Sequence, residues 1–131
     1  MLKIEHFACN VADPVAMVAW YVEHLGMRVL RRLETAPFTH FIADAAGRGV
    51  IELYSNPADP VPDYASQHPL RFHIAFATDD PDGAKAALVS AGATLVDDQT
   101  LPDGSRLVML RDPWGLPLQL CKRNPPLMYG S

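Results

Sequence analysis

Residues 2–30 read LKIEHFACNVADPVAMVAWYVEHLGMRVL, and residues 70–96 read LRFHIAFATDDPDGAKAALVSAGATLV. Both stretches begin with an apolar run that contains one histidine, and both continue through an Asp-Pro pair into a segment with helical apolar spacing. Three pairs of positions recur at a common spacing of 67 residues: His6 with His73, Asp13 with Asp80, and Glu52 with Gln119. The shared spacing indicates a duplicated supersecondary unit, neither copy of which buries its apolar face alone.

Each half predicts one strand, one helix and then three more strands. The Asp-Pro pairs at 13–14 and 80–81 are expected to begin the helices, because the carboxylate caps free N–H groups and proline needs none. Gly26 and Gly92 are expected to end them in a left-handed conformation. The expected strands are 2–11, 28–35, 39–44 and 49–55, then 70–78, 94–99, 106–111 and 116–122. The predicted fold class is therefore α+β, with two tandem βαβββ modules.

The modules are expected to be joined by a stretch that forms no strand. The sequence SNPADPVPDYASQHP predicts an extended, semi-rigid connector because proline recurs through it. The expected segments are a first module at 1–56, the connector at 57–69, a second module at 70–123 and a C-terminal tail at 124–131. Met128 and Tyr129 make that tail apolar for a terminus, so it is expected either to close over a groove or partner or to stay free.

Composition excludes several classes of protein. The chain has 131 residues, of which 49% are hydrophobic and 20% charged, as in a compact globular domain. Its 11 Lys and Arg against 15 Asp and Glu give a net charge of −4, so no basic surface is available for nucleic acid.

Its apolar runs are too short for a membrane helix, and the N-terminus lacks the pattern of a secretory signal, so we expect a cytoplasmic protein. Two distant cysteines, Cys9 and Cys121, are expected to be reduced thiols.

Three short motifs resemble a known superfamily: WYVEHLGMRVL at 20–30, VIELYSN at 50–56 and RDPWGLPLQL at 111–120. Together with the tandem βαβββ pattern they resemble the vicinal oxygen chelate superfamily. That superfamily includes glyoxalase I, methylmalonyl-CoA epimerase, extradiol dioxygenases and bleomycin-resistance proteins. The resemblance implies that each module curls its mixed sheet into half of a cup that holds a metal ion and a small-molecule substrate.

The resemblance also implies four metal ligands: His6, Glu52, His73 and Gln119. Two imidazoles, a carboxylate and an amide oxygen suit Ni, Co, Zn, Mn or Fe(II), and the identity of the ion stays open. Gln119 stands where the resembling motif usually has glutamate, so Glu52 is the only carboxylate of the set and the expected catalytic base. The amide of Gln119 is alternatively expected to orient a water or the substrate rather than to ligate the ion.

The function implied by the resemblance is that of a small metal-dependent lyase or isomerase of the glyoxalase I kind, acting on a substrate with adjacent oxygens. Two alternatives stay open: an extradiol-type Fe(II) dioxygenase, and a metal-free protein that binds a small molecule or antibiotic. A homodimer is expected, because each half is small and the connector can carry one module to a partner chain. Pairing of the two modules within one chain is the alternative.

Several charged and titratable residues match no ligand position of the repeat. His24, His40 and His68 are expected to be solvated or to support the site from outside. The arginines at 28, 31 and 32 lie on one predicted strand, whose alternation sends some of them to each face. One of them could meet an anionic substrate, although a solvated run of charge is the simpler expectation.

Overall fold

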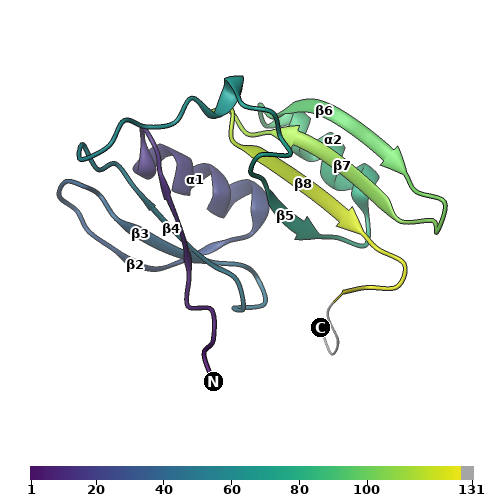
Figure 1. Cartoon of the computed structure of the whole chain (residues 1–131), viewed down its shortest axis with the longest axis horizontal. Helices are drawn as coiled ribbons and strands as arrows, with labels where there is room; N and C mark the ends of the chain where they lie inside the picture. Colours follow the sequence, from purple (N-terminus) through teal and green to yellow (C-terminus); the bar gives the residue numbers. More distant parts are fainter. Residues whose placement is uncertain (128–131) are drawn as a thin grey trace. The chain divides into compact units, whose positions relative to one another are not determined.

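The computed structural model describes residues 1–127, and the chain divides into two compact units, Met1–Pro62 and Asp63–Ser131 (Figure 1). The division falls inside the stretch predicted as connector. Positions 128–131, with the tail residues Met128 and Tyr129, lie outside the described residues. No helix within residues 1–127 is long and apolar enough to cross a membrane.

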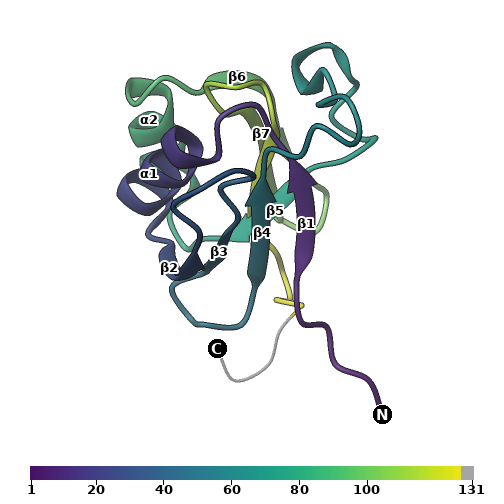
Figure 2. The same cartoon turned by 90° about the vertical axis from the view of Figure 1, so that its left-hand side faces the viewer.

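The first unit is one four-stranded mixed sheet with one helix. Its elements are β1 (Phe7–Asn10), α1 (Pro14–Leu25), β2 (Arg28–Arg32), β3 (His40–Ala43) and β4 (Val50–Tyr54). The strand order is β1-β4-β3-β2, with β1 parallel to β4 and the other pairs antiparallel. Helix α1 lies along one face of this sheet, as Figure 2 shows.

The second unit repeats this order after a short 3-10 helix. Its elements are η1 (Tyr64–Ser66), β5 (Ile74–Ala77), α2 (Pro81–Ser90), β6 (Thr94–Thr100), β7 (Arg106–Arg111) and β8 (Pro117–Lys122). The strand order is β5-β8-β7-β6, again with a parallel first pair. The α+β prediction of two βαβββ modules is confirmed.

The opening strands are shorter than predicted at 2–11 and 70–78. Strand β1 is an edge strand that pairs only with β4, and Phe7 already stands opposite Ile51, near the start of that partner. Strand β5 likewise begins opposite Leu118, directly after Pro117, whose nitrogen carries no hydrogen to donate. Because the partner strands begin at these points, the two preceding histidines lie just outside the strands.

The helix caps follow the predicted pattern, with one shift. Asp13 and Asp80 each accept a hydrogen bond from the backbone N–H three residues on, at 3.0 Å. Gly26 follows α1 with a φ of 68°. In the second helix the cap is Ala91, and Gly92 comes one residue later with a φ of 109°.

Each unit has its own apolar layer between its helix and one face of its sheet. Alternate residues of the inner strands are buried there, while their neighbours on the other face are more exposed. The largest fully buried apolar side chains are Met17, Tyr21, Ile42 and Leu53 in the first unit, and Val108, Leu110, Leu116 and Leu118 in the second. The faces turned away from the helices carry the candidate site residues.

The connector is held to both units by side chain to backbone hydrogen bonds. Asn10 donates from Nδ2 to two carbonyls just after β4, at 3.0 and 3.1 Å. Arg111 donates to two carbonyls at the start of the second unit, at 2.7 and 2.8 Å. These contacts give the connector fixed ends without making it a strand.

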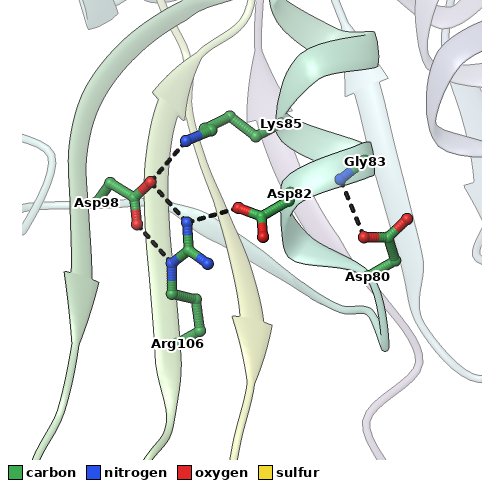
Figure 3. Close-up of polar contacts among 6 residues, drawn as sticks. All are labelled: Asp80, Asp82, Gly83, Lys85, Asp98 and Arg106. Atoms are coloured by element: carbon green, nitrogen blue, oxygen red, sulfur yellow. Dashed lines mark hydrogen bonds and ion pairs between the residues drawn. The ribbon is translucent and has the colours of Figure 1, made fainter.

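Four charged side chains form an ion-pair network between α2 and strands β6 and β7 (Figure 3). Arg106 donates to both carboxylate oxygens of Asp98, at 2.6 and 2.8 Å, and to Asp82 at 2.9 Å. Lys85 donates to Asp98 at 2.8 Å. These donors, Arg106 before Lys85, hold the pKa of the Asp98 carboxyl well below its usual range.

We expect Arg106→Gln to lower the free energy of unfolding at pH 7, and to lower it less at acidic pH. A carboxyl whose pKa is depressed on folding adds stability above its unfolded pKa, which is about 3.9, and that stability fades as the pH falls toward the folded value. Urea unfolding at pH 7 and pH 3 measures the free energy of unfolding of the variant and of the parent protein. Arg32→Gln is the control, because Arg32 pairs with Glu34 where both side chains are mostly exposed. An equal loss for Arg106→Gln at both pH values would contradict the prediction.

Candidate functional site

The first unit presents Glu52 on the sheet face opposite α1. Its neighbours in β4, Ile51 and Leu53, are buried on the α1 side, so alternation turns Glu52 the other way. The register places it directly between Ala8 of β1 and Phe41 of β3. The carboxylate is therefore fixed in the middle of the sheet, on its open face.

His6 meets this carboxylate from the segment just before β1. Its Nε2 atom lies 2.9 Å from Oε2 of Glu52, with the two side chains 31% and 18% exposed. Its Nδ1 atom contacts Oε1 of Glu5 at 2.9 Å, and the ring packs edge-on against Phe41 with centroids 5.5 Å apart. The structure thus brings together two of the four predicted ligands, with both ring nitrogens of His6 facing carboxylates.

Sequence reasoning missed the residues around this pair. Phe41 is identified only by the pairing register, which sets it beside Glu52 and under the imidazole. Glu5 could have been identified from the sequence, because it is adjacent to His6 in the chain. Comparison of the two repeats does not select it, because the second half has Phe72 at the matching position.

The second unit holds His73 and Gln119 at matching places but in different contacts. Nδ1 of His73 lies 3.0 Å from the carbonyl oxygen of Pro69. A carbonyl only accepts, so Nδ1 carries the proton and Nε2 of the neutral ring keeps its lone pair. Gln119 accepts a hydrogen bond at Oε1 from the thiol of Cys121, at 3.4 Å. Within residues 1–127, His73 and Gln119 make no polar contact with one another.

The two cysteines are poor candidates for metal ligands. Both cysteines are free, as predicted, and both are buried. Burial raises the pKa of Cys9 to about 11, and burial likewise raises the pKa of Cys121 against the opposing effect of Arg123. A cysteine binds a metal ion as the thiolate, which a raised pKa disfavours, so the nitrogen and oxygen donors are the better candidates.

The remaining histidines have local roles. His40 is 4% exposed and donates from Nδ1 to the carbonyl of Phe38 at 2.7 Å, so it belongs to the packed side of the first sheet. His24 lies on α1, with Nε2 3.7 Å from Glu23. His68 accepts at Nδ1 from the backbone of Leu70 at 3.1 Å. None of these three joins the predicted ligand set.

The His6 and Glu52 pair fits a divalent cation. Two ligand atoms at right angles on an ion, with bonds of about 2.1 Å, stand about 3.0 Å apart. The observed 2.9 Å between Nε2 and Oε2 matches that spacing, and it equally matches a direct ion pair between a protonated imidazole and the carboxylate. No group of three or more His, Cys, Asp or Glu side chains gathers as a metal cluster among the described residues. The four-ligand site, which takes two residues from each unit, stays a prediction.

Comparison with known proteins gives consistent matches over most of the chain. The model of the Glyoxalase/Bleomycin resistance protein/Dioxygenase superfamily matches residues 3–120. The uncharacterized protein YaeR of Escherichia coli (strain K12) is 33% identical over 125 residues, which cover 90% of this chain and 94% of YaeR.

Two solved structures extend the comparison. A glyoxalase family protein from Enterococcus faecalis has a TM-score of 0.69 and 26% identity, covering 92% of this chain and 97% of that one. TnmS3, an antibiotic binding protein from Streptomyces sp. CB03234, has a TM-score of 0.70 and 22% identity, covering 92% and 94%. Because the identity is only 22%, the match with TnmS3 shows a shared fold and no more.

Proposed function

The chain belongs to the Glyoxalase/Bleomycin resistance protein/Dioxygenase superfamily, and we propose that within it the protein is a metal-dependent lyase or isomerase acting on a small substrate with two adjacent oxygens. The observation that carries the proposal is the 2.9 Å separation of His6 Nε2 and Glu52 Oε2 on an open sheet face. An imidazole and a carboxylate at this spacing form half of a site for a borderline divalent ion. In the proposal, His73 and Gln119 supply the other half, from the same chain or from a second copy in a homodimer.

The proposed chemistry divides between the ion and the side chains. A bound cation supplies Lewis acidity, which polarises adjacent oxygens and stabilises negative charge that develops on them. Glu52 accepts the proton removed from the carbon beside those oxygens. The amide of Gln119 cannot take up a proton, so Glu52 is the only base among the four residues. His6 would hold the ion through Nε2, with Nδ1 donating to the carboxylate of Glu5.

A second candidate function is metal-free binding of a small molecule. It is supported by the contact at Gln119, whose Oε1 atom, the one that would face an ion, accepts a hydrogen bond from Cys121 at 3.4 Å. The fold shared with the antibiotic binding protein TnmS3 is compatible with this function. In this case the same sheet faces enclose a ligand and no proton is transferred.

Titration of the metal-free protein with Ni²⁺, Co²⁺, Zn²⁺, Mn²⁺ and, under anaerobic conditions, Fe²⁺ separates these functions. We expect stoichiometric binding of at least one ion by calorimetry, and a loss of at least about 10–100-fold in affinity for His6→Ala. His24→Ala is the matched control, because it also removes a part-exposed imidazole beside a glutamate. Selective binding of Fe²⁺ would favour the dioxygenase alternative. Absence of binding, or equal affinities for the two variants, would favour the metal-free function.

A further inference from the structure

A β-bulge in β2 turns one arginine toward the candidate site. Val29 pairs with Ile42 on the α1 side of the sheet, and the register then shifts so that Arg31 pairs with Phe41 and Leu30 has no partner. In a regular strand, residues 29 and 31 would share a face. The bulge instead places Arg31 on the open face, in one row with Phe41 and Glu52.

Arg31 is also the arginine of β2 whose charged side chain is not held by another residue of the described part of the chain. Arg32 faces the other side and pairs with Glu34 at 3.0 Å. Arg28 lies with its guanidinium beside Gly47. The side chain of Arg31 forms no hydrogen bond or ion pair with any residue from 1 to 127, and the residue is exposed. Two strand spacings, roughly 10 Å, separate its backbone from that of Glu52.

The second unit has the same bulge and the opposite charge. Its register shifts between Leu95 and Asp97, so that Asp97 lies in one row with Met109 and Gln119. The side chain of this aspartate already has a partner, since it accepts a hydrogen bond from Gln99. The repeated bulge therefore places a charged side chain at equivalent points of both open faces, Arg31 and Asp97, and of these two only Arg31 is a cation whose side chain has no partner within residues 1–127.

We infer that the open face of the first unit binds a substrate with an anionic group, a carboxylate or a phosphate, which pairs with Arg31. The inference rests on the proposed function, which puts the adjacent oxygens of the substrate at His6 and Glu52. Phe41 lies between the two ends and offers an apolar surface to the carbon atoms that join them. A guanidinium forms paired hydrogen bonds to either anion. In a chain of net charge −4, a local cation is needed to attract one.

The test uses metal-free protein in the presence of a chelator, at constant ionic strength. Inorganic phosphate and succinate are titrated in separate arms, with neutral succinamide as the reference, and amide and arginine Nε–H signals are followed by NMR. We expect saturable shifts in β2 and β3 with at least one anion and none with succinamide. Arg31→Gln should weaken that binding by about tenfold or more, and Arg31→Lys by less. Arg32→Gln removes the same charge from the opposite face and should leave binding unchanged.

The two anion arms distinguish a carboxylate site from a phosphate site, and either result supports the inference. Equal affinities for Arg31→Gln and Arg32→Gln would overturn it, as would the absence of saturable shifts with both anions. Because no metal is present, the result does not depend on the proposed ion. A protein that binds Ni²⁺ through His6 and neither anion through Arg31 retains the proposed function and loses this inference.

Discussion

Replacing Glu52 with glutamine is expected to weaken binding of Ni²⁺ and Co²⁺ on the order of 100-fold and to abolish proton transfer. The first effect follows because a neutral amide replaces the only charged ligand, so the loss should reach the upper end of the about 10–100-fold typical of residues that contact a ligand and not the ion. The second follows because an amide does not accept a proton at catalytic pH. Calorimetry measures the first effect, and exchange of substrate-carbon hydrogen with deuterated solvent measures the second.

The complementary change, Gln119→Glu, supplies the internal control of this series. It adds a second carboxylate at the position that the repeat pairs with Glu52, so it is expected to tighten divalent metal binding. The double variant, with glutamine at 52 and glutamate at 119, should recover most of the metal affinity and little of the proton transfer. Glu23→Gln, on α1, should change neither property. Unchanged affinities throughout the series would mean that these residues do not meet at an ion.

The order of elements could be predicted from sequence because the signals are local. An Asp-Pro pair fixes where each helix begins, and alternating apolar residues identify strands wherever a partner lies on both sides. The opening strands were predicted too long because strand length also depends on the partner. Residues 2–6, LKIEH, alternate apolar and polar side chains as a strand does, yet β4 begins at Val50 and offers residues 2–5 nothing to pair with.

The candidate site was only partly predictable for a related reason. The 67-residue spacing identified His6 and Glu52 as equivalents of His73 and Gln119. It could not identify Arg31 as facing the site, since a bulge reverses the alternation on which face assignments rest. Phe41 was missed because its neighbour Glu52 lies on another strand, and register is set by long-range pairing.

Leu53→Ala is expected to cost about 2–5 kcal/mol of unfolding free energy. Leu53 is fully buried in β4, in one row with Cys9 and His40 on the α1 side of the sheet. Truncation leaves a cavity beneath the helix that the surrounding strands cannot fill. A domain of ordinary stability has about 5–15 kcal/mol in total, so the variant should unfold at a much lower urea concentration.

Each unit carries one of the two tryptophans, Trp20 on α1 and Trp114 between β7 and β8, so their unfolding can be followed separately. In single-tryptophan variants made with Trp→Phe, Leu53→Ala should shift both transitions together, because a duplicated unit of this size is not expected to be stable alone. Leu30→Ala, at the 53% exposed bulge position, should cost less than about 0.5 kcal/mol. A shift of the Trp20 transition alone would show that the first unit folds independently, and would contradict the interpretation of the repeat as two halves that require each other.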